Sequence, residues 1–191
     1  RSLSGKELNK QLDKMGMVLE ETGIFKLITY LEKNKVIKAY DLLNLERNSE
    51  MIMESWLTFF ERQVDFYDKQ NFSTRKDSNF VEHEIKLEYF SLKEKKILKT
   101  ILIGIEEFLY TGFEITRKAM NDFKNLNNDM QLLLIEFSKL LAFLKDFKQN
   151  FQKVFIYDDN APQALRWVSY VPNNVEATFN FHVLKWGEEN S

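Results

Sequence analysis

The chain has 191 residues, with 27 Lys and Arg against 29 Asp and Glu, so its net charge of −2 excludes polyanion binding by overall charge alone. It contains no cysteine, which excludes disulfides, cysteine-ligated zinc and cysteine-ligated iron–sulfur clusters within this segment. With 17 Phe but only 6 Gly and 2 Pro, it should fold into long helices around a core of bulky side chains.

The first part of the chain is predicted to form a series of helices. Ser4 followed by Glu7 is a capping-box pattern, which indicates a helix start, and "ETGIFK" should end that helix. One face of this helix is expected to carry Leu8, Leu12, Met15 and Leu19. Two shorter helical pieces are expected over 24–34 and 35–48, after which Ser49 should cap a further helix. That helix has an aromatic stripe, which we interpret as core packing: Ile52, Trp56, Phe59 or Phe60, Gln63 and Tyr67.

The middle of the chain contains a loop and a candidate strand. The segment 71–80, "NFSTRKDSNF", is rich in turn-forming residues and is predicted to be a loop. In 83–90, "HEIKLEYF", apolar and charged residues alternate, which is typical of a strand. Ser91 and Glu94 then form a second capping box, so a helix should begin at Leu92.

The strongest periodic pattern predicts a pair of long helices. Two apolar series repeat with spacings of three and four, as in a heptad seam, and the Asn-rich "KNLNND" separates them. We therefore expect two antiparallel helices joined near Asn127, each roughly 40 Å long. Gly112 in the first series should admit a Phe of the partner helix or mark a bend. The first series is Leu98, Ile101, Ile105, Phe108, Gly112, Ile115 and Ala119, and the second is Met130, Leu133, Phe137, Leu140, Leu144, Phe147, Phe151 and Val154.

The end of the chain is predicted to be a β-hairpin. "LRWVSYV" and "VEATFNFHVLKW" both alternate, and "PNN" between them favours a tight turn. An isolated two-stranded hairpin is marginally stable, so a third strand should come from 83–90 or from a neighbouring domain. The predicted fold class is mainly α: a helical bundle with a long antiparallel helix pair and a small antiparallel β annex at the C-terminal end. We treat 1–191 as one domain, with 1–157 mainly helical and 158–191 forming the hairpin.

No catalytic constellation is evident. His83 and His182 are interpreted as surface or strand residues, and "SGKE" lacks the frame of a phosphate-binding loop. The adjacent acids at 106–107 and 158–159 cannot face one site and are interpreted as solvated charge. We expect no catalytic, cofactor-binding or metal-binding residues in this segment.

A basic cluster is the one candidate binding surface. Lys is unfavourable near a helix N-terminus, so several lysines there are unexpected. One interpretation is a patch that follows DNA phosphates, with Phe72 or Phe80 available for base stacking. The alternative is a solvated face that Glu82, Glu88 and Glu94 balance. The candidate DNA contacts are Arg75, Lys76, Lys93, Lys95, Lys96 and Lys99.

Two segments resemble a known family. "ALRWVSYVPNN", with Arg166, Trp167 and Val168, resembles the segment through which the chain returns from the arch of DinG-type helicases, relatives of the XPD branch of superfamily 2. "RSLSGKELNKQL" resembles the start of that arch, a helical insertion that follows the DEAH box. The resemblance implies a fragment of a larger ATP-dependent 5′–3′ DNA helicase, a cytoplasmic protein of the DNA-repair kind.

The resemblance also implies how the parts would work together. Two motor domains outside this segment would bind ATP and Mg²⁺, while the arch would enclose single-stranded DNA over the first motor domain without catalysis of its own. The partners would be single-stranded DNA and the motor domains. No apolar run approaches the ~18 residues that span a bilayer, so no membrane contact is expected.

Two other hypotheses stay open. The chain could be a free-standing helical module that binds a partner helix, or a small helical enzyme whose site has no recognised motif. An arch should have its two ends close together and an unpaired edge on its terminal hairpin, whereas an adaptor has no such constraint.

Overall fold

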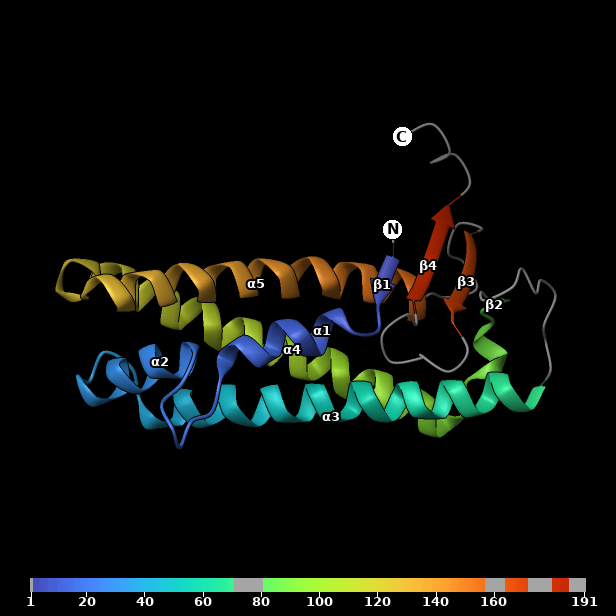
Figure 1. Ribbon diagram of the computed structural model, residues 1–191, viewed down its shortest axis with the longest axis horizontal. Coiled ribbons are helices and arrows are strands. Elements are labelled where there is room, and N and C mark those ends of the chain that lie inside the picture. Colours follow the sequence, from blue (N-terminus) through green and yellow to red (C-terminus); the bar gives the residue numbers. More distant parts are fainter. Residues whose placement is uncertain (1, 71–80, 157–163, 172–179, 186–191) are drawn as a thin grey trace. The chain divides into compact units, whose positions relative to one another are not determined.

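The structure, a computed structural model, describes residues 2–70, 81–156, 164–171 and 180–185 (Figure 1). The chain divides into two compact units: unit 1 comprises Arg1–Leu8, Ser55–Lys99 and Phe147–Ser191, and unit 2 comprises Asn9–Glu54 and Thr100–Asp146. Three long helices, α3 (Ala39–Gln70), α4 (Leu92–Asn121) and α5 (Asn128–Phe155), contribute residues to both units. The described chain is mainly helical with a small antiparallel sheet, which confirms the predicted fold class.

The predicted helix pair is confirmed. α4 begins at Leu92 as expected, and the connection to α5 contains a short 3₁₀ helix, η3 (Phe123–Asn125). Asn127 caps α5, because its side-chain Oδ1 accepts a hydrogen bond of 2.9 Å from the Met130 N–H. The Asn-rich segment 124–129 therefore starts α5, whereas α4 already ends at Asn121.

The predicted seam is buried, with one shift. Every member of the first series is buried, and so is every member of the second except Leu133, which is half-buried. Leu134 is buried instead, at 1% exposure, and Leu141 joins the seam beside Leu140. A straight helix has 3.6 residues per turn, so its buried stripe drifts away from a strict 3.5-residue repeat.

Gly112 lets α4 and α5 approach each other closely within unit 2. A Cβ placed there would lie 2.5 Å from Leu141 Cδ2 and 3.3 Å from Phe137 Cζ. Of the two predicted roles, close approach of a partner Phe is confirmed, and Leu141 lies closer still. Phe137 also meets Phe108 edge-on, with ring centroids 6.4 Å apart.

The first helix of the chain ends earlier than predicted. The first helix, α1 (Glu7–Leu12), continues as a 3₁₀ turn, η1 (Asp13–Met15), and ends at Gly16, so Leu19 lies outside it and is 96% exposed. Gly16 has φ +81°, and a Cβ there would overlap the Thr22 carbonyl, so this position requires glycine. The helical segment therefore ends at Gly16, five residues before the predicted stop at "ETGIFK".

The predicted break at Ser49 is also wrong. α2 (Ile24–Lys33) is present as expected, but α3 runs without interruption and buries Ser49, which is 3% exposed. Neighbouring polar side chains are satisfied within the helix, since Asn48 Nδ2 donates to Asn44 Oδ1 at 3.0 Å. Packing therefore overrides the capping preference of serine.

Within the residues that the structure describes, four strands form one antiparallel sheet in the order β1-β4-β3-β2. The predicted hairpin is confirmed as β3 (Ala164–Tyr170) and β4 (Asn180–Lys185), although its turn at 172–179 lies outside the described residues. The strand expected at 83–90 is shorter and earlier, as β2 (Val81–Glu84), and is followed by a 3₁₀ helix, η2 (Leu87–Tyr89). β2 pairs with β3, which supplies the predicted third strand.

The fourth strand, β1 (Ser2–Ser4), was not predicted and lies against β4, with Leu3 opposite Phe181 (Figure 1). The first and last of the described strands are therefore neighbours. β1 pairs with residues 180–182 of β4 and β2 with residues 167–170 of β3, so strands lie along part of both edges of the hairpin, where an arch was expected to leave an edge unpaired.

The core of unit 1 is aromatic. Trp56 is fully buried, and its Nε1–H donates a hydrogen bond of 3.0 Å to the Gly5 carbonyl. Phe60 lies edge-on to it at 4.6 Å between ring centroids, and Phe181 of β4 stacks on Phe60 at 5.8 Å. The further rings around Trp56 are Phe59, Phe147, Phe151 and Phe155. The interpretation of the aromatic stripe as core is confirmed, and much of the unusual Phe content is used here.

Candidate nucleic-acid interface

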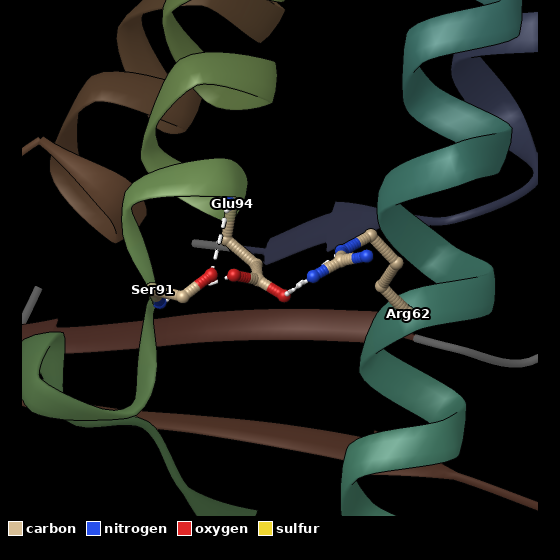
Figure 2. Close-up of polar contacts among 3 residues, drawn as sticks. All are labelled: Arg62, Ser91 and Glu94. Carbon is tan, nitrogen blue, oxygen red and sulfur yellow. Dashed lines mark hydrogen bonds and ion pairs between the residues drawn. The ribbon is translucent and has the colours of Figure 1, made fainter.

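The first turn of α4 is fixed by a capping box. Ser91 Oγ accepts a hydrogen bond from the Glu94 N–H at 3.4 Å, and Glu94 Oε2 accepts one from the Ser91 N–H at 3.1 Å (Figure 2). Both contacts are those that the sequence pattern predicts. The carboxylate also lies in the first turn, where the helix dipole favours negative charge.

Arg62 of α3 holds the same carboxylate from the other side. Its Nε and Nη2 donate to Glu94 Oε1 at 2.9 and 2.7 Å (Figure 2). The Glu94 side chain is only 12% exposed and that of Arg62 34% exposed, so water screens this ion pair incompletely. Glu94 is therefore directed toward α3 and is engaged there by Arg62.

Four lysines lie on the opposite side of this helix start. Lys93, Lys95, Lys96 and Lys99 are all exposed. At 100° per residue they occupy an arc of about 160°, centred opposite the inward direction of Glu94 and Leu98. Among the residues that the structure describes, no ion pair is found for any of the four. Glu94 bonds to Arg62 rather than to any of the four lysines, whereas Glu82 and Glu88, the other two acids of that alternative, are exposed.

An aromatic side chain precedes this lysine arc. Tyr89 in η2 is half-buried, and its ring lies 5.6 Å from that of Phe66, measured between centroids. The Lys86 ammonium lies 6.0 Å from the Tyr89 centroid. Cations and partly exposed aromatic rings together are the usual elements of surfaces that bind single strands. The sequence analysis missed Lys86 and Tyr89, because it assigned both to a strand.

The remaining predicted contacts fall outside the described residues. Arg75 and Lys76 lie within 71–80, as do Phe72 and Phe80, the candidates for base stacking. The structure therefore brings together four of the six basic candidates, all on α4.

The two histidines lie in strands, as expected, but neither is a simple surface residue. His83 of β2 is 7% exposed and forms a three-ring cluster with Tyr67 and Tyr170, at 5.0 and 5.9 Å between centroids. His182 of β4 stacks on Trp167 at 4.9 Å, and its Nε2 lies 2.8 Å from Ser169 Oγ. Burial lowers the pKa of His182 below its ordinary value.

The Ser169–His182 pair does not form a nucleophilic site. Ser169 is 2% exposed, so a substrate cannot reach its hydroxyl without rearrangement of the sheet. Among the described residues, no group of three or more His, Asp or Glu side chains is placed to hold a metal ion. In the same residues, no helix has the length and apolar character needed to cross a bilayer.

Comparison of the chain with family models, curated proteins and solved structures gives no significant match.

Proposed function

We propose that this chain is a nucleic-acid-binding accessory domain that contacts single-stranded DNA through the lysine arc of α4. One observation carries the proposal: four exposed lysines lie together at a helix start, and the one acid among them is directed away and bonded to Arg62. A cationic surface of this kind attracts phosphates even on a chain whose net charge is close to zero. Tyr89 adds an aromatic ring that could stack on a base.

The family-level form of the proposal is an arch of a DinG-type helicase. The pairing of β1 with β4 supports it, because an insertion must leave and rejoin its parent domain at nearby points. In this form, motor domains outside these residues would bind ATP and Mg²⁺ and move the strand, while this chain would help to enclose it. The strands along both edges of the β3–β4 hairpin cover part of the edge that an excised arch was expected to leave unpaired.

Fluorescence anisotropy of a labelled oligothymidylate of about 20 nucleotides tests the proposal. Four phosphate contacts predict that log K falls with log salt with a slope of about −3 for a single strand. The variant Lys95→Glu/Lys96→Glu/Lys99→Glu should lose at least about tenfold in affinity, because three attractive contacts become repulsive.

The matched control changes three exposed lysines outside the arc to glutamate: Lys26, Lys124 and Lys145. This control changes the net charge by the same amount. An equal loss of affinity would mean that DNA responds to the overall charge of the chain rather than to the lysine arc, and it would overturn the proposed surface. Absence of binding at about 50 mM salt, where phosphate contacts are strong, would overturn it as well.

A helical protein-interaction module is the second proposal. Unit 2 exposes large apolar side chains on α4 and α5, namely Tyr110, Phe113, Met120, Leu132 and Ile135. Failure to bind DNA by a correctly folded chain would favour this second function.

A further inference from the structure

A groove in unit 2 lies between the start of α3 and the second half of α4. It encloses about 520 Å³ and is separate in sequence from the lysine arc. The two helices pack closely nearby, since a Cβ at Gly104 would lie 2.8 Å from Met51 Cε and 3.0 Å from Ile52 Cγ1. The groove is therefore bounded by closely packed helices rather than by loops.

Two tyrosines and four carboxylates give this groove its chemical character. Tyr40 and Tyr110 line it and are 71% and 75% exposed, which is unusual for rings of this size on a folded surface. The acids that line it are Asp41, Glu106, Glu107 and Glu114. Glu114 is already ion-paired with Arg117 at 2.9 Å, and Lys118 is the one cation among the lining residues. The other three acids therefore leave the groove with an excess of negative charge.

Asn44, which lines the groove, offers a hydrogen-bond donor. Asn44 Oδ1 accepts two hydrogen bonds, from Thr111 Oγ1 at 2.9 Å and from Asn48 Nδ2 at 3.0 Å. Thr111 and Asn48 are buried, which fixes the orientation of the Asn44 amide. The Asn44 N–H₂ has no acceptor within the described part of the chain, so it can donate to a bound carbonyl.

The positions of the carboxylates in the groove favour an extended cationic ligand over a metal ion. The carboxylates do not converge as metal ligands would, because no metal-binding group is found in the described residues. They are distributed along two helices and flank exposed aromatic rings. Aromatic faces attract guanidinium and ammonium groups, and distributed carboxylates suit an extended chain with several cations.

We propose that this groove binds a basic peptide segment of a partner protein, with an arginine or lysine side chain against Tyr40 and Tyr110. The carboxylates would pair with flanking cations, and the Asn44 amide would donate to a backbone carbonyl of the peptide. The proposal uses no residue of the lysine arc and does not depend on DNA binding.

The experiment uses the whole chain and a fluorescein-labelled hepta-arginine peptide, with hepta-glutamate as the peptide control. The variant Tyr40→Ala/Tyr110→Ala should weaken hepta-arginine binding about tenfold or more, because two cation–π contacts are lost. Tyr40→Phe/Tyr110→Phe should keep most of the affinity, since the aromatic faces remain. The apolar control Phe113→Ala/Leu132→Ala removes exposed side chains outside the groove and should change affinity less than about twofold.

A second pair of variants tests the role of the charges. Glu106→Gln/Glu107→Gln should weaken binding, whereas Glu20→Gln/Asp146→Asn, which removes two exposed acids elsewhere in unit 2, should not. Circular dichroism confirms that each variant is folded. Absence of hepta-arginine binding would overturn the proposal, and so would equal losses in the groove and control variants.

Sedimentation velocity tests the alternative that a second copy of this chain, rather than a partner peptide, occupies the groove. If the chain self-associates and Tyr40→Ala/Tyr110→Ala abolishes that association, the groove binds a second copy and the proposed partner is wrong. If the chain stays monomeric while hepta-arginine binds the groove, the proposal stands.

Discussion

Replacement of Gly112 by alanine sets two effects of similar size against each other. Alanine is favoured over glycine inside a helix by about 1 kcal/mol. Its Cβ, however, would lie 2.5 Å from Leu141 Cδ2, 3.2 Å from Leu141 Cδ1 and 3.3 Å from Phe137 Cζ. Overpacking of a close-packed core costs about 1–3 kcal/mol, and both neighbours are almost fully buried with little room to move. We expect the steric cost to prevail, with a net loss of up to about 2 kcal/mol.

Urea unfolding followed by circular dichroism measures this change directly. A double-mutant cycle identifies its cause: Leu141→Val should cost about 1 kcal/mol alone but much less beside Gly112→Ala, because the shorter side chain makes room for the new methyl group. A gain of about 1 kcal/mol in Gly112→Ala would mean that helix propensity acts unopposed. The close approach of α4 and α5 at Gly112 would then be refuted.

Three further predictions concern the core, the helix start and the sheet. Phe137→Ala should lower the free energy of unfolding by about 3–5 kcal/mol and Leu140→Ala by about 2–5 kcal/mol, and a loss below about 0.5 kcal/mol in urea titration would contradict the seam. Glu94→Ala should cost about 2–4 kcal/mol, because it removes a cap and two charge-assisted hydrogen bonds, and in a double-mutant cycle its effect should not add to that of Arg62→Ala. Because burial lowers the pKa of His182 below 6.5 in the folded chain, the unfolded chain takes up this proton first as pH falls. Stability should therefore decrease below pH 6.5 until the folded-state pKa is passed, and His182→Gln should flatten that dependence in urea titrations across this range.

Local sequence patterns predicted the features that depend on neighbours in the chain. The Ser91–Glu94 capping box, the start of α4 at Leu92 and the cap at Asn127 each involve residues three or four apart. The seam of α4 and α5 was predictable for the same reason, since its spacing repeats within each helix. The exposure of the four lysines follows from that spacing, because they lie opposite the apolar positions.

Features that join distant segments were not predictable. β1 is three residues long, too short for a recognisable alternation, and it pairs with residues near the end of the chain. The partner of Glu94 is 32 residues away, so the sequence left that carboxylate as a candidate neutraliser of the lysines. Glu106 and Glu107 are exposed, as solvated charge would be, but both line one groove, which was not expected of acids adjacent in sequence. The Asn44–Thr111 hydrogen bond beside them spans 67 residues, so no local sequence pattern indicates that groove.

The pairing of β1 with β4 also determines the order in which the protein can assemble. Leu3 pairs with Phe181, so β1 cannot take its place in the sheet of unit 1 during synthesis until β4 has left the ribosome. Unit 2 ends at Asp146, so all of its residues have been synthesised before β4. We therefore expect a nascent chain to form helical contacts early and to close the sheet last, as a slow step with high contact order.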